Sequence, residues 1–439
     1  MTTFVLGVFF GRGKSPLFYP FHSKRVAITA FAARGHPADQ QPSGNRALLT
    51  IGVLARRCSA PRNTIEAMAI DEPRAETRSS ASLRVLIAGG GTGGHIIPAL
   101  AVAQDLIMRH QAEVLFVGTP RGMESRLVPA AGFHLRLIEV GPLKNVSLAT
   151  RIHTMLDIPR SLFVCRALIR EFNPDVVFGV GGYASGPGMA AALMLRVPTM
   201  AFEPNAMPGL ANRLVGKWVQ AAAVNFPAAA TFFRNAEVTG IPVRPDFFKL
   251  PPATGEAPHL LVFGGSQGAR LFNITLPAIA PDLLASVPGL TILHQAGVRH
   301  VEATEAAYKA SGANPAQWRV SGFLDDMPMR FAQANLVMSR SGASTVAELA
   351  AAGKPAVLVP FAAAADDHQT RNAEEMVKAE AAVMLKESDL ADHDKVIDAL
   401  IQLLGSHERL TAMSAAALTQ SHPQAAEDIA NRLVSLVRA

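Results

Sequence analysis

The chain has 439 residues, of which 49% are hydrophobic and 17% charged, and this balance excludes general disorder and predicts two or three globular domains. Its two cysteines, Cys58 and Cys165, are too few for a disulfide framework or a thiolate metal site and favour a reducing compartment over secretion. The net charge is +6, but residues 1–70 alone contribute nine basic and two acidic groups. The rest of the chain is nearly neutral, so nucleic acid is not an expected partner.

Residues 1–80 are basic and lack the periodicity of a helix or a strand, so we expect a disordered leader. The apolar run at 4–10 is short for a secretory signal, which leaves a flexible leader or a natural start at Met68 as the alternatives. No uninterrupted apolar run reaches 18 residues, because Arg196 and Pro198 break the segment 189–202. We therefore expect no membrane-spanning helix.

Short buried-strand segments alternate with glycine-rich turns and helical segments from Leu83 onward. The first strand is followed by a helical pattern over 97–108, and a proline-rich connector at 242–258 precedes a second, similar strand, loop and helix. This alternation predicts an α/β fold of two Rossmann-like parallel-sheet domains, residues 81–245 and 246–439, whose strand ends face a cleft. The expected strands are 83–88, 113–117, 175–179, 198–202, 259–263, 291–294, 336–339 and 356–359.

The first glycine loop, Gly89–His95, has the spacing of a dinucleotide-binding motif. The acidic residue that such a motif needs at the end of the next strand is missing, because that strand ends at Val117, Gly118 and Thr119. The loop is then expected to receive an anion or to let a substrate approach the backbone. His95 ends the loop and is a candidate for proton transfer, with a purely structural histidine as the alternative.

The second glycine loop, Gly264–Gly268, also matches the nucleophile elbow of serine hydrolases. A triad of Ser266, Asp325 or Asp326, and His368 would have the right order. The linker and the earlier glycine loop disfavour that single-sheet fold. The alternative is that Ser266 and the neighbouring amides hold a diphosphate at a helix N-terminus.

Small residues at 339–345 precede a helix that carries Glu348 one turn after Ser344. This pattern fits a capping box, and equally a phosphate cradle with a carboxylate placed to accept ribose hydroxyls. The segment 366–369 contains two aspartates and a histidine, but no further ligand stands at helical spacing, so we expect no metal.

Basic and apolar residues alternate in the segment between Lys144 and Arg170. Such a helix can pack its apolar side inside the domain, or it can attach to anionic lipid. The sequence does not decide between these two uses.

Taken in order, these motifs resemble the MurG family, the UDP-N-acetylglucosamine (UDP-GlcNAc) transferases that convert lipid I to lipid II in bacterial peptidoglycan synthesis. The resemblance runs from about Leu83 to the C-terminus and leaves the leader unmatched. One departure is Pro204, where the family commonly has glutamine. The matching segments are 90–95, 179–188, 203–209, 240–244, 264–269, 323–327, 340–348 and 367–372.

The resemblance implies the GT-B fold, with an acceptor and membrane domain at 81–245 and a UDP-GlcNAc-binding domain at 246–439. It implies His95 as the catalytic base and a group of donor-binding residues around the nucleotide sugar. Ser266 is expected at the diphosphate, Leu324 at the uracil, Glu348 at the ribose and Gln369 at the sugar. The remaining expected contacts are Thr92, Gly93, Gly94, Asn205, Arg244, Ala343, Ser344 and Thr345.

The implied reaction is an inverting hexosyl transfer to the muramyl 4-hydroxyl of lipid I without cofactor or metal. The implied place is the cytoplasmic face of the inner membrane, peripherally bound to anionic inner-leaflet lipid, with cell-wall and division proteins as further partners. Glu203 remains an alternative base to His95. A non-catalytic nucleotide-sugar-binding protein of a membrane complex remains an alternative to the enzyme.

Overall fold

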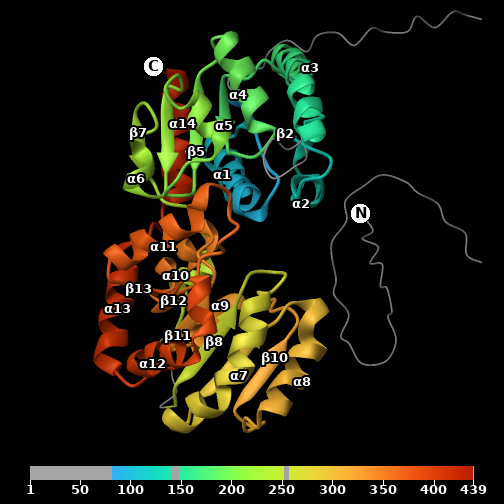
Figure 1. The fold of residues 1–439 in the computed structure, drawn as a ribbon. Coiled ribbons are helices and arrows are strands. Elements are labelled where there is room, and N and C mark those ends of the chain that lie inside the picture. The colour runs from blue at the N-terminus through green and yellow to red at the C-terminus, as the bar shows by residue number, and fades with distance from the viewer. Residues whose placement is uncertain (1–81, 141–147, 252–256, 439) are drawn as a thin grey trace, which may run out of the picture. The chain divides into compact units, whose positions relative to one another are not determined.

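The computed structural model describes residues 82–140, 148–251 and 257–438 (Figure 1). The predicted leader lies outside this described part of the chain. Within it, the strands form two sheets, one of seven strands and one of six, and all their pairings are parallel. The prediction of two parallel-sheet α/β domains is therefore confirmed.

The first sheet has the strand order β3-β2-β1-β4-β5-β6-β7. Its strands are β1 (Arg84–Ala88), β2 (Glu113–Gly118), β3 (His134–Leu137), β4 (Val176–Gly179), β5 (Thr199–Glu203), β6 (Ala221–Val224) and β7 (Ala236–Val238). Its helices are α1 (Gly93–His110), α2 (Glu124–Ala130), α3 (Leu148–Phe172), α4 (Ser185–Met194), α5 (Leu210–Val215) and α6 (Pro227–Ala230).

The second sheet has the strand order β10-β9-β8-β11-β12-β13. Its strands are β8 (His259–Phe263), β9 (Thr291–Gln295), β10 (Trp318–Ser321), β11 (Leu336–Ser339), β12 (Ala356–Leu358) and β13 (Ala382–Met384). Its α-helices are α7 (Arg270–Ser286), α8 (Val301–Ser311), α9 (Met327–Gln333), α10 (Ala343–Ala351), α11 (His368–Lys378), α12 (His393–Leu404) and α13 (His407–Thr419). The described residues also contain four 3₁₀ helices: η1 (Pro245–Lys249), η2 (Val298–His300), η3 (Ala365–Asp367) and η4 (Glu387–Ala391).

Both faces of each sheet are covered, and the strand sequences show why. Along β1, Val85 and Ile87 belong to one buried cluster, while Leu86 and Ala88 belong to another. Side chains alternate across a strand, so a continuous apolar run supplies a core on each side of the sheet. Strand β8 is built in the same way, with alternate residues in two separate clusters.

The last helix, α14 (Ala425–Arg438), packs with the first sheet although it follows the second in the chain (Figure 1). Its buried residues Ile429 and Leu433 share a cluster with the apolar side chains of α1. Arg109 of α1 also pairs with Glu427 of α14 at 2.9 Å. The predicted range 246–439 therefore contains a helix whose core contacts are made with the first half.

Candidate active site

The first glycine loop connects β1 to α1 at the carboxyl end of the first sheet. Gly90 and Gly91 have φ angles of 143° and 94°, which side-chain-bearing residues rarely adopt. A Cβ atom on Gly90 would lie 2.3 Å from the carboxyl carbon of Glu124. The glycines are therefore required by the backbone conformation and by the side chain that packs against the loop.

That side chain is a buried carboxylate, although none was expected at this loop. Glu124 accepts hydrogen bonds from the N–H of Gly91 at 2.6 Å, the N–H of Thr119 at 2.8 Å and the hydroxyl of Thr119 at 2.9 Å. Cβ atoms on Gly118 and Gly122 would also collide with it. Because Glu124 occupies the N–H of Gly91, only the amides nearer to α1 remain to meet a substrate.

His95 lies in the first turn of α1, half-buried, with Nδ1 3.0 Å from the hydroxyl oxygen of Thr92. Burial, together with the charge of His368 and against the influence of Glu124, lowers the pKa of His95 to about 4, so the ring is neutral near pH 7. Gly181, at φ 87°, brings its backbone against this ring, and a Cβ there would lie 3.0 Å from Nε2. The ring is thus held from two loops.

Glu203, at the end of β5, is buried, and both of its carboxylate oxygens accept hydrogen bonds. One carboxylate oxygen accepts from the N–H and the side-chain amide of Asn205 at 3.0 and 3.1 Å. The other accepts from the N–H of Gly209 and the side-chain amide of Asn212, both at 3.0 Å. Burial raises the pKa of Glu203 and these hydrogen bonds oppose that rise. The carboxylate thereby fixes the position of Asn205.

A fully buried asparagine connects this loop to the second sheet. The side chain of Asn372 donates to Asn205 Oδ1 at 3.2 Å and to the carbonyl of Ser341 at 3.1 Å, and it accepts from the N–H of Ala206 at 2.8 Å. Arg213 and Asp366 form a second connection, an ion pair at 3.2 Å. Elements at the carboxyl ends of both sheets are therefore in direct contact.

The N-terminus of α10 carries Ala343, Ser344 and Thr345. Gly342 is the N-cap and no side chain caps this helix, so the capping-box interpretation is wrong. Ser344 Oγ is buried and makes no hydrogen bond within the described residues. A Cβ on Gly94 would lie 3.6 Å from this oxygen. The first glycine loop and the start of α10 thus lie against each other.

Glu348 is on α10, one turn beyond Ser344. Burial raises its pKa to about 7, while the positive charge of Arg244 acts to lower it. Arg244 itself is exposed, with its guanidinium 5.0 Å from the centre of the Phe247 ring. Ionising this carboxyl group in the free protein is costly, so a ligand that donates hydrogen bonds to it would stabilise its charged form.

The other predicted donor contacts lie at the carboxyl end of the second sheet. Ser266 is exposed in the loop between β8 and α7, Leu324 is buried after β10, and Gln369 is in the first turn of α11. The backbone carbonyl of Gln369 accepts from the hydroxyl of Ser341, next to α10, at 2.8 Å. In the part of the chain that is described, Ser266 and His368 share no hydrogen bond, and no group of three or more His, Cys, Asp or Glu side chains could hold a metal.

Two family models match the chain: the N-terminal domain of glycosyltransferase family 28 over residues 85–224 and its C-terminal domain over 259–429. A protein of Anaeromyxobacter dehalogenans named UDP-N-acetylglucosamine--N-acetylmuramyl-(pentapeptide) pyrophosphoryl-undecaprenol N-acetylglucosamine transferase is 44% identical over 81% of this chain and 94% of its own length. The chain belongs to the MurG family. A Myxococcus xanthus member with the same name is 38% identical over 81% of this chain and 93% of its own length.

Solved structures agree with membership of the MurG family. The crystal structure of Acinetobacter baumannii MurG matches with a TM-score of 0.70 and 31% identity, covering 80% of this chain and 99% of that one. The kitacinnamycin glycosyltransferase, at 19% identity and a TM-score of 0.60, covers 81% and 100% and supports the fold alone. The predicted family, its transferase class and the GT-B fold are confirmed, whereas the role of each site residue stays a prediction.

Proposed function

We propose that the protein transfers N-acetylglucosamine from UDP-GlcNAc to the muramyl 4-hydroxyl of lipid I, with inversion, to give lipid II. The names of the MurG relatives support the donor and the acceptor. The observation that carries the assignment of the site is the approach of Gly94 to Ser344. It brings the loop that ends in His95 beside a helix N-terminus with an unpartnered buried hydroxyl, so a base and an anion site adjoin.

The donor would lie along the second sheet. Ser344 Oγ and the amides of Ala343 and Thr345 would meet the diphosphate, and the loop of Ser266 would meet it at the N-terminus of α7. Glu348 would accept the ribose hydroxyls, Leu324 would cover the uracil, and Gln369 would contact the sugar. Arg244, Asn205 and the amides of Thr92, Gly93 and Gly94 would complete the contacts, with Arg244 stabilising the departing charge.

His95 would act as the base. Its ring is neutral near pH 7, and an Nδ1–H that donates to Thr92 would leave the Nε2 lone pair free. As the muramyl oxygen bonds to the anomeric carbon from the face opposite UDP, its proton passes to Nε2 and the bond to the diphosphate breaks. Glu203, whose two oxygens already accept four N–H groups, would position Asn205 instead.

We further propose that the first domain binds peripherally to anionic lipid at the cytoplasmic face of the inner membrane. The neighbouring helices α3, α4 and α5 expose Phe163, Met194 and Leu214, and Trp218 follows with 67% of its surface exposed. Arg196, Lys217 and Arg234 make no ion pair within the described residues. Exposed apolar side chains with unpaired basic side chains near them suit binding to a membrane surface with anionic headgroups.

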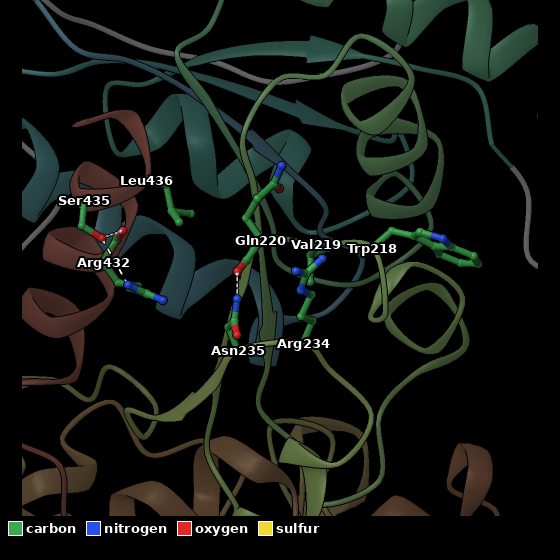
Figure 2. A pocket seen from close by; sticks show the side chains of 8 residues that line it. All are labelled: Trp218, Val219, Gln220, Arg234, Asn235, Arg432, Ser435 and Leu436. Atoms are coloured by element: carbon green, nitrogen blue, oxygen red, sulfur yellow. Dashed lines mark hydrogen bonds between the residues drawn. The ribbon is translucent and has the colours of Figure 1, made fainter. Parts of the chain in front are cut away.

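A hollow of about 540 Å³ adjoins this surface at the amino ends of β6 and β7, between Arg234, which precedes β7, and Arg432 of α14 (Figure 2). Its lining includes Arg234 and Arg432, with Trp218 at one side. The surface lies at the strand ends opposite to His95, and no helix in the described residues meets the length and hydrophobicity of a membrane span. Cell-wall and division proteins remain predicted partners.

The transfer itself is tested with labelled UDP-GlcNAc, a short-chain lipid I analogue and a chelator. We expect transfer with inversion of the anomeric centre, and its loss by more than about 100-fold in His95→Ala, since a general base contributes about 10²–10⁴-fold. His134→Ala, an exposed histidine on β3, is the matched control. UDP-GlcNAc binding without any turnover would instead support the non-catalytic protein, and labelling of Ser266 by a serine-directed phosphonate would support the hydrolase.

The proposed lipid-binding surface is tested by co-sedimentation with two kinds of vesicle. One kind contains phosphatidylglycerol, and the other contains phosphatidylcholine alone. We expect binding to the anionic vesicles, weakened by salt and by Trp218→Ser. The control is Leu418→Ser, an exposed residue on the second domain. Equal binding of the variant with Trp218→Ser and the unmodified protein would contradict this surface.

A further inference from the structure

Arg340 and Glu387 form a largely buried ion pair beside the predicted sugar site. Arg340 follows β11, Glu387 begins η4 after β13, and their side chains are 12% and 18% exposed. Neither residue was singled out in the sequence. Removing such a pair from water is costly unless its remaining hydrogen-bonding atoms are also satisfied. The remaining partners therefore indicate what the pair holds in place.

Among the described residues, the further hydrogen-bond partners of these two side chains all lie in the turn 359–362. Arg340 donates from Nη1 to the carbonyls of Val359 and Pro360, at 3.1 and 3.2 Å. The second oxygen of Glu387 accepts the N–H of Ala362 at 3.0 Å. The guanidinium also faces the ring of Phe361, 5.3 Å from its centre. Cation and anion together fix the path of this turn.

The turn 359–362 orients the side chain of Gln369. The N–H of Phe361 donates to Gln369 Oε1 at 3.0 Å. Its Nε2 group makes no hydrogen bond within the described residues. This hydrogen bond sets the orientation of the amide and leaves its N–H donors available to a ligand. Gln369 can therefore donate to a sugar hydroxyl.

We propose that Glu387 is a positioning residue that, through Arg340 and the turn 359–362, fixes Gln369 so that its amide donates to the sugar of the nucleotide-sugar donor. The proposal rests on the proposed role of Gln369. It separates two parts of donor recognition: UDP is held by Ser266, Ser344 and Glu348, whereas the hexose depends on the network that Glu387 anchors. Loss of the network should therefore weaken the binding of the sugar and spare the binding of UDP.

The test compares the Kd of UDP with that of UDP-GlcNAc, by calorimetry on the full chain, for Glu387→Gln. Glutamine offers one acceptor oxygen where Arg340 and Ala362 need two, so the turn loses one anchor. We expect UDP to bind within about twofold of the unmodified protein and UDP-GlcNAc to bind about tenfold more weakly, with a matching rise in donor KM. Glu374→Gln, which removes an exposed pair with Arg371 on α11, is the control and should change neither.

Gln369→Ala distinguishes failure of this proposal from failure of the site. If that variant keeps the ratio of the two Kd values of the unmodified protein, the role of Gln369 is wrong. If Gln369→Ala changes this ratio while Glu387→Gln does not, or if Glu387→Gln weakens both ligands equally, the positioning role of Glu387 is wrong. The double variant should be no worse than Gln369→Ala, because both changes act on one contact.

Should Glu387→Gln fail to fold, Arg340→Lys provides the same comparison. Lysine keeps the charge but cannot reach the Val359 and Pro360 carbonyls and Glu387 as a planar guanidinium does. The same selective loss of UDP-GlcNAc affinity is expected, and an unchanged ratio of the two Kd values would overturn the proposal.

Discussion

The carboxylate of Glu124 lies 2.6 Å from the backbone nitrogen of Gly91, and this hydrogen bond helps to fix the conformation of the first glycine loop. The three glycines Gly90, Gly118 and Gly122 leave the space that the carboxylate fills. The loop leads directly into Thr92 and His95. The geometry of the proposed base therefore depends on an acid that belongs to a neighbouring helix.

Glu124→Gln should slow transfer about tenfold or more and change UDP-GlcNAc affinity far less, because the donor is proposed to lie mainly on the second sheet. The amide has one acceptor oxygen for three donors, and a buried donor left unsatisfied costs about 1–3 kcal/mol. Transfer rates, donor Kd and urea unfolding would measure this. Glu113→Gln, which removes an exposed pair with Arg84, is the control. A full transfer rate in Glu124→Gln would contradict the positioning role.

Glu348 predicts a pH dependence of donor binding. Its pKa is raised to about 7 by burial, so the group is largely protonated below pH 7 in the free protein. Ribose hydroxyls donate best to the carboxylate, so the affinity for UDP-GlcNAc should rise as the pH increases from about 6 to 8. Calorimetry in buffers of different ionisation enthalpy should show proton release on binding. In Glu348→Gln the affinity for UDP-GlcNAc should be lower and independent of pH. If the variant retains the pH dependence, another group causes it.

The same shift predicts how Glu348 contributes to stability. A carboxyl whose pKa is raised by folding binds its proton more tightly in the native state, so its contribution falls as the pH rises from about 4.5 to 7. Glu348→Gln should remove that part of the decline. Urea unfolding of the two proteins at pH 5 and pH 7.5 would measure the difference, and parallel declines would contradict it.

Gly181→Ala should disturb the proposed base. The added Cβ would lie 2.9 Å from Cδ2 and 3.0 Å from Nε2 of His95, at a backbone φ of 87° that alanine also disfavours. We expect kcat to fall about tenfold or more and donor Kd to change little. Gly132→Ala is a useful comparison, because that glycine has a similar φ of 83° and no neighbour within 4 Å. Equal transfer rates for the two variants would show that the ring is not displaced.

Leu433→Ala should destabilise the first half of the protein although it lies near the C-terminus. Leu433 is fully buried in the cluster that also contains the apolar side chains of α1. A buried leucine truncated to alanine costs about 2–5 kcal/mol. Val437→Ala, on the same helix but 37% exposed, should cost far less. Hydrogen exchange should place the loss in β1, β4 and α1, and a loss confined to the second sheet would contradict this assignment.

The strands with continuous apolar runs between glycine turns were predictable from the sequence, because such a run has few other uses in an α/β chain. The predicted 259–263 and 336–339 coincide with β8 and β11, the predicted 198–202 is shifted by one residue from β5, and the other five segments differ by one residue at one end. The strands β3, β6, β7, β10 and β13 were not predicted. The supporting network was not predictable. Glu124, Arg340 and Glu387 act on loops far away in sequence, and their partners are mostly backbone groups, which leave no trace in a residue pattern. That Gly90, Gly118 and Gly122 leave room for the side chain of Glu124 is seen only in the three-dimensional structure.

The placement of α14 has a consequence for biosynthesis. Domains generally fold as units, N-terminal first, while the chain emerges from the ribosome. Here the first sheet lacks Ile429 and Leu433 from its core until residues 425–438 have been made, after the whole second sheet. The first half can therefore reach its final stability only after the second sheet and α14 have been made. An arrested nascent chain would carry an incomplete first half whose apolar surface on α1 stays open to chaperones.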